Sequence, residues 1–367
     1  MKIQRIETFA TRAVAIVRLT TDDGRQGYGQ VAPFNADITA QVLHRQVAPH
    51  VLGASIEGLA DLETLSDRCI EANLKFPWSY VCRALSGVDT AAWDLLGKAA
   101  DQPVAALLGG TGRDVPAYGS SMSRSITPGD EAARLSRLRD ERGFDAFKIR
   151  VGQVAGHDAD AWPGRTEALV PTVRQAVGDD VRLLVDANSC YTPPRAIEVG
   201  RMLQANGVVH FEEPCPYWEL EWTAEVAAAL ELDVAGGEQD NDLAQWRRMI
   251  RMDAVDIVQP DVCYVGGLTR ALRVARLAAE AGKSCVPHSA NLSMVTLFTV
   301  HLMLAIENAG PYVEFCIEDS GWVDGLFEPA LKVENGRVSI TGEPGWGVRL
   351  NADWLERAER MVSEMGV

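Results

Sequence analysis

Short apolar segments alternate with longer helical patterns from residue 116 onward. Helical segments such as AEVAAALEL and LTRALRVARLAAEAG carry apolar residues at intervals of three and four. This alternation predicts an α/β fold with a parallel sheet, and eight strands in about 200 residues fit a closed barrel better than an open sheet. The segments that we expect to be strands are 116–120, 145–150, 181–187, 208–212, 233–237, 255–260, 284–288 and 311–315.

The two ends of the chain follow other patterns. Residues 2–8 and 13–20 alternate like the strands of a hairpin, TTDDGRQGYGQ supplies an Asp-Gly turn signal, and residues 80–100 have a strong helical period. We therefore expect an α+β domain over residues 1–115 and the barrel over residues 116–330. Residues 331–367 return to short strands and turns, as in GRVSITGEPGWGVRLN, and are expected to pack back on the first domain.

Charge and hydropathy narrow the possible partners. The net charge of −16 argues against nucleic acid, because binding to phosphates needs a basic surface. No apolar run approaches the roughly 20 residues of a membrane-spanning helix. The N-terminal segment MKIQRIETFATRAVAIVRL carries charges throughout, unlike a secretory signal. We expect a cytoplasmic protein with no nucleic-acid and no membrane partner.

Polar residues mark the C-terminal ends of the predicted strands. The strands of a parallel barrel end at one rim, where barrel enzymes hold their catalytic groups, so these side chains are expected to converge. From the third strand to the eighth, they follow one another at spacings of 26, 26, 23, 27 and 26 residues. They are Asp186, Glu212, Glu238, Asp261, His288 and Glu314.

The first three of these residues form a candidate metal site. Asp186, Glu212 and Glu238 end successive strands, and three converging carboxylates repel one another unless a cation neutralises them. Oxygen ligands without Cys or His suit a hard ion, which favours Mg²⁺ over zinc. The alternative is that each acid caps the helix that follows its strand, a common arrangement at such turns. Three acids in successive units favour the metal.

Two further pairs complete the candidate site. Asp261 and His288 end neighbouring strands, where a carboxylate–imidazole hydrogen bond would fix the tautomer of the ring and raise its basicity. Lys148 and Arg150 lie two residues apart on one strand, so both side chains point the same way, inward in a barrel, where they could hold an anionic substrate. The alternative for His288 is a purely structural role, and the alternative for Lys148 and Arg150 is that they are surface charges on an edge strand.

The order of these motifs resembles the enolase superfamily, and within it the mandelate racemase-like subgroup of acid-sugar dehydratase type. The similarity runs through ALSGVDTAAWDLLGK, KIR, VDAN, FEEP, GGEQ, QPDVCYVGGLT, VPHS, VEF and PGWGV, and so covers essentially the whole chain. The resemblance implies a modified (β/α)7β TIM-type barrel under an α+β capping domain that the C-terminal tail completes. It also implies a homo-oligomer, because members of this family form dimers to octamers.

The resemblance assigns roles to the candidate residues. It makes Asp186, Glu212 and Glu238 ligands of one Mg²⁺ per subunit, Asp261 and His288 the catalytic dyad, and Glu314 an electrophilic or hydrogen-bonding partner of the substrate carboxylate. Glu213 and Asn188 lie beside ligands without an assigned role. One departure is Arg150, which stands where the subgroup usually has the second lysine of a Lys-x-Lys motif. A guanidinium stays protonated, so we expect Arg150 to act as a clamp or electrophile.

The chemistry implied is abstraction of the proton α to a carboxylate, through an enediolate. Dehydration needs one His, which acts first as base and then as acid, so we expect a lyase that converts an aldonate or aldarate into a 2-keto-3-deoxy acid. The alternative is a racemase, epimerase or cycloisomerase that acts on a 2-hydroxy acid or sugar-acid lactone, with Lys148 as second base. A metal-dependent hydrolase is disfavoured because VPAYGSS, the first barrel strand, has no His-x-His. A non-catalytic sugar-binding protein would need neither the dyad nor the metal cluster.

Overall fold

Eight parallel strands form the barrel that the alternating pattern predicts. The computed structural model describes residues 1–319 and 321–366. The strands lie in the order β11-β4-β5-β6-β7-β8-β9-β10, and backbone hydrogen bonds between Cys285 and residues 308 and 310 join the last strand to the segment before β11. Their bounds are β4 (Asp114–Ser120), β5 (Ala146–Arg150), β6 (Arg182–Asp186), β7 (Val208–Glu212), β8 (Asp233–Gly236), β9 (Ile257–Val258), β10 (Ser284–Cys285) and β11 (Val313–Cys316).

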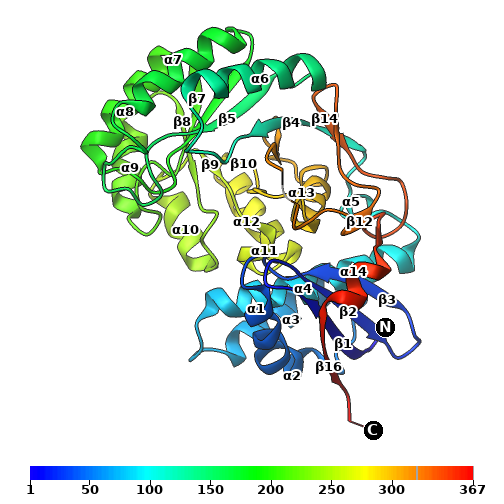
Figure 1. Cartoon of the computed structure of the whole chain (residues 1–367). Coiled ribbons are helices and arrows are strands. Elements are labelled where there is room, and N and C mark those ends of the chain that lie inside the picture. The colour runs from blue at the N-terminus through cyan, green and yellow to red at the C-terminus, as the bar shows by residue number, and fades with distance from the viewer. Residues whose placement is uncertain (320, 367) are drawn as a thin grey trace.

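Helices connect each strand to the next and form the outer layer (Figure 1). Since helices follow the first seven strands and β11 closes the series, the predicted (β/α)7β barrel is confirmed. The helices are α6 (Pro128–Arg142), α7 (Arg165–Val177), α8 (Pro193–Ala205), α9 (Leu220–Ala229), α10 (Leu243–Arg251), α11 (Val262–Val265), α12 (Leu268–Glu280) and α13 (Met294–Met303).

The N-terminal residues form the α+β unit, in which the long helix α4 packs against an antiparallel sheet. The sheet contains a strand that the sequence pattern did not predict, β3, in the glycine-rich segment QGYGQ. Glycine is depleted in strands, but a Cβ on Gly29 would lie 2.3 Å from Thr90 Oγ1 of α4, so this close packing needs glycine. The elements are β1 (Ile3–Ala10), β2 (Ala15–Thr21), β3 (Gln26–Gln30), α1 (Ala36–Val42), the π-helix η1 (Leu43–Val47), α2 (Ala48–Val51), α3 (Leu59–Ala72), α4 (Trp78–Ala100) and α5 (Val104–Leu107).

The C-terminal tail contacts both parts of the molecule. β16 pairs antiparallel with β1 at the edge of the N-terminal sheet, whereas β14 pairs antiparallel with the start of β4 in the barrel. The domain boundaries after residues 115 and 330 stay predictions. The tail elements are β12 (Phe327–Glu328), β13 (Val333–Glu334), β14 (Arg337–Ser339), β15 (Arg349–Leu350), α14 (Ala352–Arg357) and β16 (Glu359–Glu364).

The N-terminal unit sits on the rim where the barrel strands end. The Gln30 side chain accepts the backbone N–H of Met294 at 3.1 Å and donates to Ser293 Oγ at 2.9 Å, at the start of α13. Asp89 of α4 accepts the backbone N–H of Thr269 in the first turn of α12, at 3.1 Å. Since both helices begin at the C-terminal side of a barrel strand, the N-terminal unit covers the rim that was predicted to carry the chemistry.

Two barrel strands are shorter than expected. β9 ends at Val258 and β10 at Cys285, so Asp261 and His288 lie three residues beyond the strands rather than at their last positions. Pro260 and Pro287 precede them, and proline has no N–H to donate to a strand ladder. A hydrogen bond from the backbone N–H of His288 to Pro260 O, at 3.2 Å, still keeps the two segments side by side.

Within the described ranges 1–319 and 321–366, no helix has both the length and the apolar character needed to cross a membrane.

Candidate active site

Three buried carboxylates meet at the barrel rim. Asp186 and Glu212 are the last residues of β6 and β7, and Glu238 follows β8 after a turn at Gly237, whose φ is +108°. One oxygen from each carboxylate lies within 4.8 Å of the others. All three residues are at most 7 % exposed, so their mutual repulsion is poorly screened by water.

The cluster fits a hard divalent cation by its donor chemistry. It offers only carboxylate oxygens, which are the donors that Mg²⁺ prefers. Glu238 Oε2 is buried without a hydrogen-bond partner among the described residues, although it lies 3.2 Å from His288 Nε2. The alternative of separate helix caps is wrong for these residues, because the helices after their strands begin at other N-cap residues: Thr192, Glu219 and Asp242.

Asp261 and His288 form a hydrogen-bonded pair. Asp261 Oδ2 lies 2.8 Å from His288 Nδ1, while Oδ1 accepts the backbone N–H groups of Cys263 and Tyr264 at 2.7 and 2.9 Å. Asp261 therefore caps α11 and orients the imidazole at the same time. Because a carboxylate can only accept, Nδ1 carries the proton in this bond.

The surroundings of His288 favour its charged form. Burial opposes protonation, but the carboxylates of Glu238, Asp261 and Glu314 outweigh burial and raise the His288 pKa to about 10. A cation that offset the charge of these carboxylates would lower the pKa of the ring and favour its neutral form, which can accept a proton.

Lys148 and Arg150 both point into the barrel, at 0 % and 4 % exposure, rather than to the surface. Lys148 Nζ lies 2.7 and 2.9 Å from the oxygens of Glu212 and 2.8 Å from Glu314 Oε1. Burial would lower the pKa of this ammonium, but Glu212 and Glu314 outweigh it and raise the pKa. Arg150 Nη1 pairs with Asp186 Oδ2, so both cations are held by carboxylates of the site.

Glu314 acts as an acceptor in this arrangement. Its Oε1 accepts the Ser120 hydroxyl at 2.7 Å, and its Oε2 accepts the backbone N–H of Ser289 at 2.8 Å. Burial opposes ionisation of Glu314, but the charges of Lys148 and His288 lower its pKa to about 2. An ionised Glu314 holds Lys148 in place, and it could donate a hydrogen bond to a substrate only after protonation.

Arg124 belongs to the site although the sequence patterns did not identify it. It lies in the loop after β4, and its guanidinium donates to Asn188 Oδ1 at 2.8 Å and to Gly152 O at 3.0 Å. Arg150 donates to the same Asn188 oxygen at 3.1 Å. Burial and then the charge of Arg150 lower the Arg124 pKa to about 10. Its loop, SMSRSI, has no periodicity that could have identified it, since only the fold brings it to β6.

The backbone beside the carboxylate cluster is strained. Asn188 and Glu213, which were left without a role, both have φ of +42°, a region that residues other than Gly rarely occupy. The Asn188 backbone N–H donates to Asp186 Oδ1 at 2.7 Å. Burial and the charges of Glu238 and Glu212 raise the Glu213 pKa well above its ordinary value.

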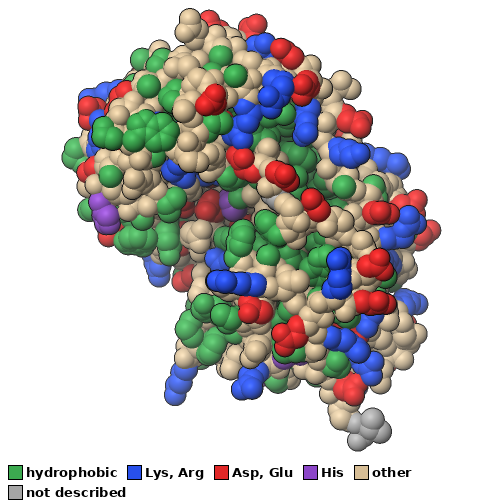
Figure 2. Space-filling model, viewed as in Figure 1, with side chains coloured by type: hydrophobic (Ala, Val, Ile, Leu, Met, Phe, Trp, Pro, Cys, Tyr) green, Lys and Arg blue, Asp and Glu red, His purple; other side chains and the backbone are tan. Residues whose placement is uncertain are grey.

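Figure 2 shows the molecular surface hollowed between the barrel and the N-terminal unit.

Models of known protein families match both the N-terminal unit and the barrel. Residues 3–109 match the mandelate racemase/muconate lactonizing enzyme N-terminal domain, and residues 130–354 match the enolase C-terminal domain-like family. An arabinonate dehydratase from Saccharolobus solfataricus is 32% identical over 91% of this chain and 87% of its own length. A D-galactarolactone cycloisomerase from Agrobacterium fabrum is 33% identical over 74% of this chain and 72% of its own.

Solved structures share the whole architecture. A crystal structure of a Roseobacter denitrificans protein described as a candidate racemase is 56% identical, covers 100% of both chains and has a TM-score of 0.97. An L-talarate dehydratase from Polaromonas, complexed with Mg and L-glucarate, is 27% identical, covers 100% of this chain and 99% of its own, and has a TM-score of 0.84. The family models, the barrel and the cap together show that this chain is a mandelate racemase-like member of the enolase superfamily.

Proposed function

We propose that the protein is a Mg²⁺-dependent lyase that dehydrates an acid sugar, an aldonate or aldarate, to a 2-keto-3-deoxy acid. The observation that supports this most directly is the asymmetry of the site. His288, oriented by Asp261, is suited to move a proton, whereas Lys148 and Arg150 are cations held by carboxylates. Dehydration requires one such base, while racemisation requires a base on each face of the substrate.

Each residue then has a defined task. Asp186, Glu212 and Glu238 would hold the Mg²⁺, which would stabilise negative charge on the substrate carboxylate as the α-proton leaves. His288 Nε2 takes that proton, because Nδ1–H is engaged by Asp261 Oδ2. The same nitrogen then returns the proton to the departing β-hydroxyl, which leaves as water.

The cations of the site support an anionic substrate. Lys148 lies between Glu212 and Glu314 and offsets their negative charge. Arg124 gives its hydrogen bonds to neutral acceptors, so its charge stays available to an anion. In a chain of net charge −16, these groups supply the local positive charge that a carboxylate substrate needs.

The test is a screen of the purified protein with Mg²⁺ against a library of aldonates and aldarates, with formation of a 2-keto acid as the readout. We expect turnover of one stereochemical group, its loss with a chelator and its loss in His288→Asn. Proton exchange at the α-carbon of some other carboxylate, with no 2-keto acid from any acid sugar, would overturn the dehydratase assignment.

An isomerase is the second candidate function. It is favoured by the relative named as a cycloisomerase and by the neighbour described as a candidate racemase. In that reaction Lys148 would serve as a second base on a 2-hydroxy acid or sugar-acid lactone. The test is incorporation of deuterium from D₂O at the α-carbon with no formation of a 2-keto-3-deoxy acid. If Lys148→Met abolishes this exchange, the result would support an isomerase over a dehydratase.

We further propose that the protein forms a homo-oligomer. Trp218 and Trp222 follow β7 and are 56% and 37% exposed, which is typical of aromatic side chains at a subunit contact. Light scattering of the purified chain measures the subunit number, and a monomer would contradict the proposal.

A further inference from the structure

The two oxygens of Glu212 have different surroundings. Oε2 lies 2.7 Å from Lys148 Nζ, 3.0 Å from Gln259 Nε2 and 3.3 Å from His210 Nε2. Oε1 has one of these contacts, to Lys148 Nζ at 2.9 Å. A carboxylate oxygen accepts hydrogen bonds, so in this contact His210 Nε2 carries the proton and donates it to Oε2.

His210 and Gln259 approach Glu212 from inside the barrel. His210 precedes Glu212 by two residues on β7, so both side chains point inward and His210 lies one layer nearer the start of the strand. His210 is 3% exposed and Gln259 is fully buried. Gln259 Oε1 has no hydrogen-bond partner among the described residues, which indicates that the amide is oriented by what its NH₂ group contacts.

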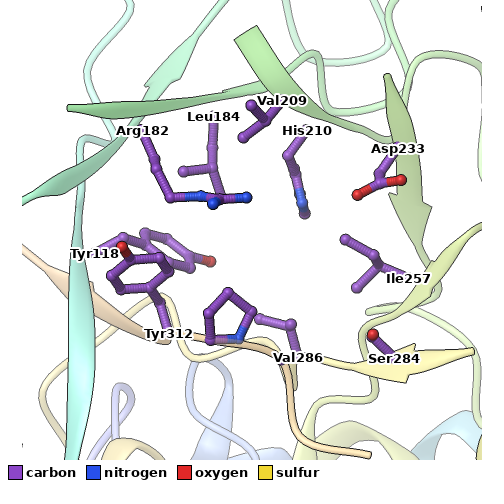
Figure 3. A pocket seen from close by; sticks show the side chains of 12 residues that line it. Tyr118, Arg182, Leu184, Val209, His210, Asp233, Ile257, Ser284, Val286 and Tyr312 are labelled. Atoms are coloured by element: carbon purple, nitrogen blue, oxygen red, sulfur yellow. The ribbon is translucent and has the colours of Figure 1, made fainter. Parts of the chain in front are cut away.

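Behind His210 lies a cavity of about 100 Å³ at the N-terminal end of the barrel, opposite the rim (Figure 3). The His210 imidazole extends from β7 into this cavity, between Arg182 on one side and Asp233 on the other. Tyr118 and Ser284 also line the cavity. His210 therefore separates the barrel floor from the carboxylate of a candidate metal ligand.

We infer that His210 and Gln259 are positioning residues of the metal site. They hold Glu212 Oε2 from the floor side and so fix the orientation of the carboxylate, and Oε1 would be the oxygen offered to a cation. This inference rests on the proposed metal site. Without the two donors the carboxylate can rotate away from this orientation, and partners of this kind change metal affinity by about 10–100-fold.

The experiment measures Mg²⁺ binding by isothermal titration calorimetry in the full-length wild type, His210→Ala, His210→Phe and Gln259→Leu. We expect the Kd to rise by about 10-fold or more in each variant. Ser284→Ala is the matched control, since Ser284 lines the same cavity without contacting Glu212. Circular dichroism identifies variants that fail to fold. If a His210 variant does not fold, the Mg²⁺ affinity of Gln259→Leu still tests the inference.

Rescue by imidazole distinguishes positioning from a loss of packing. His210→Ala enlarges the floor cavity, so millimolar 4-methylimidazole should enter it, donate to Glu212 and restore the affinity for Mg²⁺. His210→Phe fills the same space with a ring that has no donor, so it should not be rescued. Affinity within twofold of wild type in His210→Ala and Gln259→Leu, or equal rescue of both His210 variants, would overturn the inference.

Failure of the metal site itself is a separate result. If the wild type binds no Mg²⁺, or if Glu238→Gln binds it as tightly as the wild type, the proposed ligand set is wrong and the roles of His210 and Gln259 fall with it. If Glu238→Gln abolishes binding while the His210 and Gln259 variants bind normally, only the inference fails.

Discussion

Asp261→Asn should separate the catalytic task of this residue from its structural task. One carboxylate oxygen caps α11 by accepting two backbone N–H groups, and the other accepts Nδ1–H of His288 at 2.8 Å. An amide has a single accepting oxygen. Since two backbone donors compete for it with one imidazole, we expect the oxygen to stay on α11 and the NH₂ group to face His288.

The imidazole must then accept at Nδ1 and carry its proton on Nε2. In this tautomer Nε2 cannot take a proton from the substrate, and a reversal of this kind costs a factor on the order of 10⁴ in rate. That factor corresponds to about 5 kcal/mol of activation free energy. The free energy of unfolding should change by less than about 1 kcal/mol, because the helix cap is kept.

Asp261→Ala is the matched variant, because it removes the cap as well as the partner of His288. We expect a similar loss of rate together with a loss of about 1–2 kcal/mol in the free energy of unfolding. The assays are α-proton exchange in D₂O followed by NMR, ¹⁵N NMR of the histidine tautomer, and urea unfolding. An Asp261→Asn protein that retains more than about a tenth of the wild-type exchange rate would refute the reasoning.

Three further predictions concern stability. Lys148→Met leaves Glu212 and Glu314 without their buried cation and should lower the free energy of urea unfolding by about 3–5 kcal/mol. The loss should be smaller when Mg²⁺ is present, because the metal would neutralise the same carboxylates. Equal losses with and without Mg²⁺ would contradict binding of Mg²⁺ beside Lys148. Burial lowers the His301 pKa to about 3, so the unfolded chain binds a proton that the folded chain resists. This group alone should lower the free energy of unfolding by about 1.4 kcal/mol per pH unit from about pH 6 toward pH 3. His301→Leu should therefore reduce the slope of unfolding free energy against pH by one proton, and an unchanged slope would count against this assignment. Gly29→Ala places a Cβ 2.4 Å from the Ala91 backbone nitrogen and should cost about 1–3 kcal/mol in thermal unfolding. Gly129→Ala, in the first turn of α6 and with nothing within 4 Å, is the control and should be no less stable than wild type.

Several features could be predicted from the sequence because they repeat with the period of the barrel. One acid or histidine at or just after each strand from the third to the eighth, at nearly constant spacing, is a local signal that predicts convergence without any knowledge of packing. The fold and the family are confirmed, and the structure brings Asp186, Glu212 and Glu238 within 4.8 Å of one another. The roles of the site residues stay proposals.

Other features depend on contacts between distant segments, which leave no local pattern. The glycine-rich β3 forms a strand because α4 packs closely against it. Arg124 joins the site because its loop lies beside Asn188, 64 residues further along the chain. The predicted strands 255–260 and 284–288 extend beyond the observed ends of β9 and β10, because the pattern of apolar residues does not reveal where the prolines interrupt pairing.

The sequence by itself determined which residue types stand at the end of each strand, and therefore the class of chemistry that the rim can support. Only the tertiary structure decided how these groups are charged and oriented. Lys148 stays a cation because Glu212 and Glu314 surround it, and Glu212 Oε2 lies within hydrogen-bond distance of His210 and Gln259, which come from two different strand segments. The physical reason is that protonation and orientation depend on distances between side chains from different strands, which the order of residues along one strand does not contain.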